Sequence, residues 1–89
     1  MAVIRDPKSK NDLVMRLKRV EGQLRGIQAM IAAGEDCEKV AQQLSASRKA
    51  LDKAFFNVLA CAIQAGPGAA ARSAESRVRH AAELLAKFG

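Results

Sequence analysis

A row of apolar residues at alternating steps of four and three places the strongest constraint on the fold of this chain. The row consists of Leu13, Leu17, Val20, Leu24, Ile27 and Ile31. This spacing puts the side chains along one side of an α-helix, close to the 3.5-residue repeat of helices that wind around each other. It predicts a helix from Asn11 to about Ala33, ended by Gly34 in the left-handed conformation.

A second row with the same spacing predicts a second long helix. It runs through Val40, Leu44, Ser47, Leu51, Ala54, Val58, Cys61 and Ala65, and Gly66, Pro67 and Gly68 end it. Asp36 is placed to cap its start. Because a short turn joins the two helices, they must form an antiparallel hairpin in which the numbers of facing residues add to about 70. A shorter third helix within residues 69–89 completes an all-α fold.

Composition narrows the class of protein further. The 89 residues include 15 Lys+Arg and 9 Asp+Glu, and the resulting charge of +6 favours a polyanionic partner, nucleic acid first. Trp and Tyr are absent, which argues against a β-sandwich or barrel. A chain this short buries only about 60–65% of its surface, so we expect a homo-oligomer. Without an apolar run long enough to span a membrane, the chain is expected to be cytoplasmic.

The chain is expected to hold one domain. Residues 1–10 contain Pro7 and scattered charges without periodicity, which predicts a flexible basic arm. Residues 11–89 then form a single helical domain.

Basic residues gather at one height of the predicted hairpin. Arg16, Lys18, Arg19 and Arg25 lie on the first helix, and Arg48, Lys49 and Lys53 lie on the second. In the predicted register Arg19 lies near Leu51, so the two clusters form one positive belt. Such a belt binds DNA phosphates with strong salt dependence and without reading bases. The alternative is an ordinary solvated surface, since no established DNA-binding motif is present.

Two cysteines and one histidine are the candidate sensing residues. Cys37 lies in the first turn of the second helix, where free N–H groups and the helix dipole favour a thiolate. Cys61 lies about 36 Å further along the same helix, so the two thiols cannot meet within one chain. Two antiparallel copies of this helix crossing near Lys49 would bring Cys37 of one chain to Cys61 of the other. The alternative is that the thiols are small apolar residues and His80 an ordinary surface residue.

Three segments carry a resemblance to a known family. They are Arg16-Leu17-Lys18-Arg19-Val20-Glu21-Gly22-Gln23-Leu24-Arg25-Gly26-Ile27, then Asp36-Cys37, then Gln43-Leu44-Ser45-Ala46-Ser47 with Ala50-Leu51. The pattern, over about residues 11–65, resembles the CsoR family of bacterial repressors, which sense copper, nickel or cobalt, formaldehyde, or persulfide. The resemblance implies a three-helix protomer, a dimer of dimers, and basic residues that bind double-stranded operator DNA. The motif match assigns DNA contacts to Arg16, Lys18, Arg19 and Arg48, and the belt adds Arg25 and Lys49.

The sensing residues depart from the family's pattern. Cys37 matches the shared cysteine, which works across the subunit boundary, but the metal sensors' histidine falls on Ala62. Their next ligand, and the second thiol of the persulfide sensor, fall on Gly66. Cys61, beside the position of the missing histidine, is therefore interpreted as a displaced partner from the neighbouring chain.

We therefore expect a repressor that leaves its operator when Cys37 and Cys61 are modified, as a disulfide, a polysulfide or an electrophile adduct. The alternative is a metal-sensing repressor of the same family, in which Cys37, Cys61 and His80 from adjoining chains bind Cu(I), Zn(II) or nickel. A small helical enzyme of chorismate-mutase type is a remote alternative. The arginines lie outside the apolar rows and no catalytic set is present, so we expect no enzymatic activity.

Overall fold

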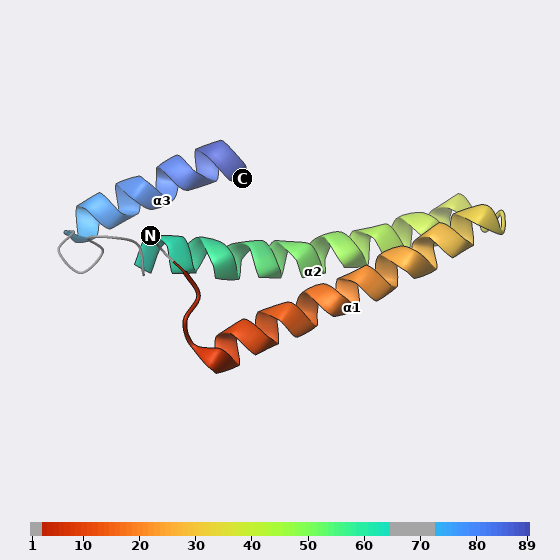
Figure 1. Cartoon of the computed structure of the whole chain (residues 1–89). Helices are drawn as coiled ribbons and strands as arrows, with labels where there is room; N and C mark the ends of the chain where they lie inside the picture. The colour runs from red at the N-terminus through yellow and green to blue at the C-terminus, as the bar shows by residue number, and fades with distance from the viewer. Residues whose placement is uncertain (1–2, 65–72) are drawn as a thin grey trace.

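The computed structural model describes residues 3–64 and 73–89 and contains three helices (Figure 1). Helix α1 spans Pro7–Ala32, α2 spans Cys37–Gln64 and α3 spans Ala74–Phe88. No strand occurs in these two ranges, so the predicted all-α class and helix order are confirmed. The expected break at residues 66–68 lies outside the described residues. None of the described helices combines the length and hydropathy needed to cross a membrane.

Helix α1 begins one turn earlier than the sequence analysis predicts. The Asp6 carboxylate accepts hydrogen bonds from the Ser9 backbone N–H at 3.0 Å and from the Ser9 hydroxyl at 2.7 Å. Pro7 occupies the first helical position, where its missing N–H breaks no hydrogen bond. Residues 7–10 are therefore helical, and the expected start of the helix at Asn11 is wrong. The apolar row could not show this turn because the turn contains no apolar side chain except proline.

The turn between α1 and α2 follows the prediction. Gly34 adopts a left-handed φ of 74°, which glycine tolerates without steric strain. The Asp36 carboxylate accepts hydrogen bonds from the backbone N–H groups of Glu38 and Lys39 at 3.1 and 3.3 Å. The next helix thus begins at Cys37, directly after its cap.

One row of residues on each helix, spaced seven positions apart, lies in the contact between α1 and α2. We call this contact the seam. The buried members are Leu13, Val20 and Ile27 of α1 and Ser47 and Ala54 of α2, all at most 9% exposed, while Val40 and Cys61 are half-buried. Seven residues make almost two full turns, which returns each side chain to the same side of its helix. The Ser47 hydroxyl donates a hydrogen bond to Gln23 Oε1 across the seam at 3.2 Å. Their numbers add to 70, which confirms the predicted register.

The remaining large residues of the two rows stay exposed. They are Leu17, Leu24 and Ile31 of α1 and Leu44, Leu51 and Val58 of α2, between 37% and 59% exposed. Each follows a seam residue by four positions. Because the helices run in opposite directions, this equal offset turns both sets toward the same side of the hairpin. We call this surface the apolar face.

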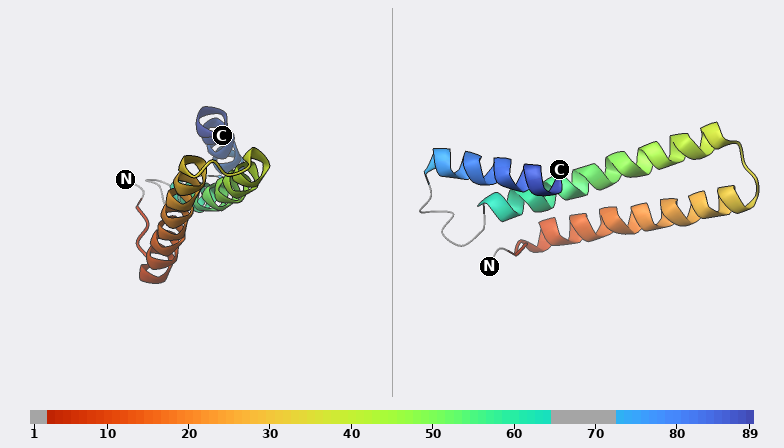
Figure 2. Two further views of the ribbon diagram at one scale, coloured as in Figure 1. Left: turned by 90° about the vertical axis from the view of Figure 1, so that its right-hand side faces the viewer. Right: turned by 90° about the horizontal axis from the view of Figure 1, so that it is seen from above.

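Helix α3 folds back along α2 on the side away from α1 (Figures 1 and 2). The Ser73 hydroxyl caps its start by accepting a hydrogen bond from the Ser76 backbone N–H at 3.1 Å. His80, Ala81 and Leu84 are half-buried, whereas Val78 and Phe88 remain exposed. The third helix thus adds a second contact to α2 and leaves the apolar face open.

Candidate functional site

The two cysteines lie at opposite ends of α2 and on different sides of it. Cys37 is exposed and Cys61 is half-buried, and both thiols are free. Because α2 is continuous from Cys37 to Gln64, about 36 Å separates them along its axis, as predicted. Cys37 repeats every seven residues with Leu44, Leu51 and Val58 of the apolar face, whereas Cys61 repeats with Ser47 and Ala54 of the seam. The two rows are three residues apart along the helix, so the side chains of the two rows leave it in directions roughly 60° apart.

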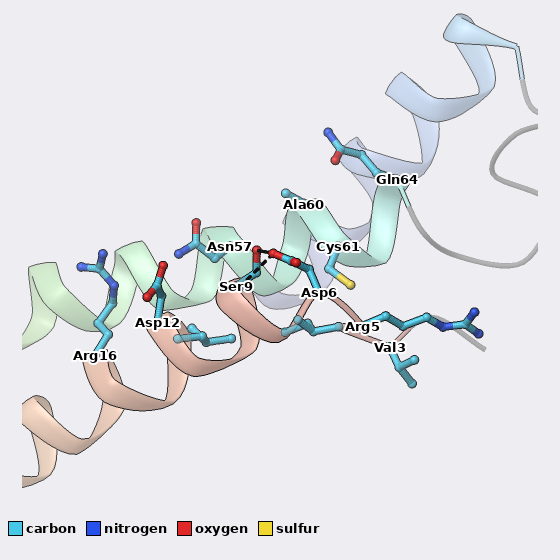
Figure 3. A pocket seen from close by; sticks show the side chains of 12 residues that line it. Val3, Arg5, Asp6, Ser9, Asp12, Arg16, Asn57, Ala60, Cys61 and Gln64 are labelled. Atoms are coloured by element: carbon cyan, nitrogen blue, oxygen red, sulfur yellow. Dashed lines mark hydrogen bonds between the residues drawn. The ribbon is translucent and has the colours of Figure 1, made fainter.

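Cys61 lines a groove of about 540 Å³ at the open end of the hairpin. The groove lies between the chain's N-terminal segment with the first turns of α1 and the end of α2. Arg5, Asp12 and Arg16 line it from one side, and Asn57 and Gln64 from the other. Figure 3 shows the sulfur turned toward the N-terminal segment. The protomer itself therefore surrounds much of this thiol, a placement that sequence reasoning missed although the seven-residue spacing from Ala54 signals it.

The surroundings of Cys37 differ from the sequence expectation in one respect. The N–H groups of Glu38 and Lys39 donate to Asp36 and are not free for the sulfur. The Lys39 Nζ atom in turn lies 3.5 Å from Glu35 Oε1 and forms an ion pair with this carboxylate. Cys37 is thus an exposed thiol beside an occupied cap, open to a ligand or to a second chain.

A single protomer does not assemble the predicted metal ligands. His80 lies on α3, half-buried, and Cys37 and Cys61 lie at the two ends of α2. Within residues 3–64 and 73–89, no three His, Cys, Asp or Glu side chains lie close enough to hold a metal ion. A metal site built from Cys37, Cys61 and His80 thus requires groups from more than one chain.

The six predicted DNA-binding residues lie on both helices of the hairpin, four on α1 and two on α2. Arg16 is half-buried in the groove wall, and Lys18, Arg19, Arg25, Arg48 and Lys49 are exposed. The hydrogen bond between Gln23 and Ser47 fixes the height of both helices, so Arg19 of α1 and Arg48 of α2 lie near the same level. In the part of the chain that the structure describes, the ion pairs join Lys39 to Glu35 and Arg79 to Glu75. None of the six cations is engaged by a carboxylate there.

Cations without carboxylate partners leave their charge available to the phosphates of a nucleic acid. The sequence profile of the family described as "metal-sensitive transcriptional repressor" matches residues 9–87. The chain belongs to this family, whose members are transcriptional repressors, and the predicted family assignment is confirmed.

Two curated relatives are similar to this chain. The copper-sensing transcriptional repressor RicR of Mycobacterium tuberculosis is 40% identical over 76 residues, which cover 75% of this chain and 79% of the relative. The copper-sensing transcriptional repressor CsoR of Bacillus subtilis is 38% identical over 52 residues, which cover 58% of this chain and 52% of the relative. No solved structure gives a significant match.

Proposed function

We propose that this chain is a copper-responsive repressor that binds operator DNA through its basic belt. The observation that carries the proposal is the family match over residues 9–87, together with two relatives that are both named copper-sensing. These comparisons favour the metal-sensing interpretation over the thiol modification that the sequence analysis puts first.

The donor groups of this chain fit Cu(I) better than Zn(II). Soft thiolates bind both Cu(I) and zinc, but a structural zinc site almost always has four ligands, one more than the three candidates of this chain. Cys37 supplies an accessible thiol that matches the family motif, and Cys61 supplies a second, less accessible one. When bound, the ion would be coordinated by side chains of adjoining chains and would thereby link those chains. We assign Cys37 as the first ligand, and Cys61 and His80 as candidates for the others.

A second copy of the chain is the natural cover for the apolar face. Six large apolar side chains on one side of the hairpin are each between 37% and 59% exposed, and contiguous exposed apolar patches mark interaction sites. Cys37 lies in line with this face, so a copy seated on it comes within reach of the thiol. We therefore propose a homodimer that pairs further into a tetramer. A ligand at the joint can then oppose DNA binding by favouring one arrangement of the chains.

Copper titration of the DNA complex tests the proposal. Fluorescence anisotropy of labelled operator DNA should fall as Cu(I) is added to its complex with the unaltered protein. In parallel, fewer thiols per chain should react with a thiol-specific dye when Cu(I) is bound. Cys37→Ala should bind the same DNA yet stay bound when Cu(I) is added. Cys61→Ala, the matched variant at the other end of α2, measures whether the second thiol contributes. Release of Cys37→Ala by Cu(I) would contradict the assignment.

Thiol modification is the second candidate, favoured by Ala62 at the position of the family's histidine and by the exposure of Cys37. Separate samples treated with polysulfide or formaldehyde distinguish it from copper sensing. Release by either reagent, with no release and no thiol protection by Cu(I), would select this candidate.

A further inference from the structure

One polar contact interrupts the apolar seam between α1 and α2. Ser47 is 2% exposed and is the buried polar side chain of the described residues. Its hydroxyl donates to Gln23 Oε1 at 3.2 Å, with Val20 and Ile27 buried on either side of Gln23 along α1. The contact therefore joins the two helices near the middle of their length.

The short turn at Gly34 limits the registers that the hairpin can adopt, and this contact distinguishes the observed register from one shifted by seven residues. The other seam residues are apolar and repeat every seven positions, so a slip of seven residues would preserve apolar packing. Such a slip would leave the Ser47 hydroxyl buried without its acceptor, which is unfavourable. Single polar residues in apolar helix seams are known to specify register for this reason.

The same contact lies beside the cations of both helices. Arg19 precedes Gln23 by about one turn of α1, and Arg48 directly follows Ser47 on α2. A seven-residue slip would displace Arg48 from Arg19 by about 10 Å along the axis. Phosphates follow each other every 3.4 Å along the axis of one DNA strand, so a displacement of about 10 Å spans roughly three of them.

We propose that Ser47 and Gln23 are positioning residues that hold the two halves of the basic belt at matching heights for duplex phosphates. This inference rests on the proposed DNA-binding function. It assigns the pair an indirect role, in which Ser47 acts on DNA affinity from within the protein and without touching DNA.

Ser47→Ala tests the proposal because it separates fold stability from DNA binding. Alanine has a higher helix propensity and fits a buried apolar seam, so the melting temperature should stay the same or rise. Operator affinity should nevertheless fall about tenfold. This loss corresponds to one charge-assisted hydrogen bond between a displaced cation and a DNA phosphate. The slope of log K against log salt should become shallower by about 1 for each cation displaced. Ser45→Ala, on the same helix and outside the seam, is the matched control. It should leave the operator affinity and the salt slope unchanged.

Gln23→Ala and the double variant complete the experiment. If the two residues act as one contact, the double variant should lose no more affinity than either single variant. Additive losses would instead show that Gln23 contacts DNA by itself, and would overturn the proposal. Ser47→Ala with unchanged affinity and slope would overturn it as well. If the unaltered chain shows no salt-dependent DNA binding, the proposed function fails and this inference fails with it.

Discussion

At the scale of single residues, short polar side chains decide where the helices begin. Asp6 and Asp36 each accept backbone N–H groups at a helix start. The Ser9 hydroxyl and backbone N–H both donate to the Asp6 carboxylate and hold its pKa below the ordinary value of 3.8. These donors favour the charged form, so the first turn of α1 depends on that charge.

The lowered pKa predicts acid fraying of this turn. A carboxylate with a lower pKa in the folded state stabilises the fold above its unfolded pKa, near 3.8, and this contribution is lost as pH falls through the folded pKa. Amide exchange at Ser9 should therefore accelerate in that acidic range before exchange at Val20 does. Asp6→Asn, a neutral residue that also caps well, should remove this pH dependence. An unchanged pH profile in that variant would argue against the role of Asp6.

Local rules explain which residue positions were predictable. Asp36 and Gly34 follow from capping and from left-handed backbone geometry, because each effect depends on a few neighbouring residues. The cap at Asp6 follows from the same rule, but the absence of apolar periodicity in residues 7–10 concealed the helix that it begins.

At the scale of helices, the seam divides each apolar row into two sets. The four-three spacing predicts both long helices, and the register follows from the short turn between them. The spacing cannot show that Ile27 is buried while Ile31, four residues later, is 59% exposed, because both side chains are equally apolar. Only the small size of Ser47 and Ala54 marks the side of α2 that α1 approaches closely.

Truncation of the two isoleucines should separate the seam from the apolar face. Ile27→Ala removes buried contacts within one protomer, so the free energy of unfolding should fall by about 3 kcal/mol at every protein concentration. Ile31→Ala should lower stability only at concentrations where chains associate. Chemical denaturation at two protein concentrations measures both effects. Equal losses for the two variants in the dilute sample would contradict the assigned seam.

At the scale of the whole molecule, the protomer is a rod of 55 × 28 × 15 Å with little interior. Its apolar face, its exposed Cys37 and the basic residues of α1 and α2 are all surface features. A single protomer of this kind shows where each candidate residue lies. The residues that would complete the proposed metal site come from other chains of an oligomer. For this reason the sequence could place Cys37 and Cys61 along α2 but could not give the neighbours that they acquire in an oligomer.

A charge in the apolar face should prevent this assembly. Leu51→Asp would bury an unpaired carboxylate in the proposed contact, at a cost of several kcal/mol. We expect the variant to sediment as a single chain and to lose most of its DNA affinity, while the unaltered protein sediments as a dimer or larger species. Val78→Asp, on α3 and already 69% exposed, is the control and should leave the mass unchanged. An unaltered protein that sediments as a single chain would refute the assembly.

The unequal exposure of the two sulfurs has a practical consequence. Cys37 is open to solvent, while the groove at the far end of α2 partly screens Cys61. In protomers kept apart by Leu51→Asp, a bulky maleimide dye should therefore couple to Cys37 much sooner than to Cys61. Such a protomer thus offers a selective attachment point for one fluorophore at the closed tip of the rod, without any engineered cysteine.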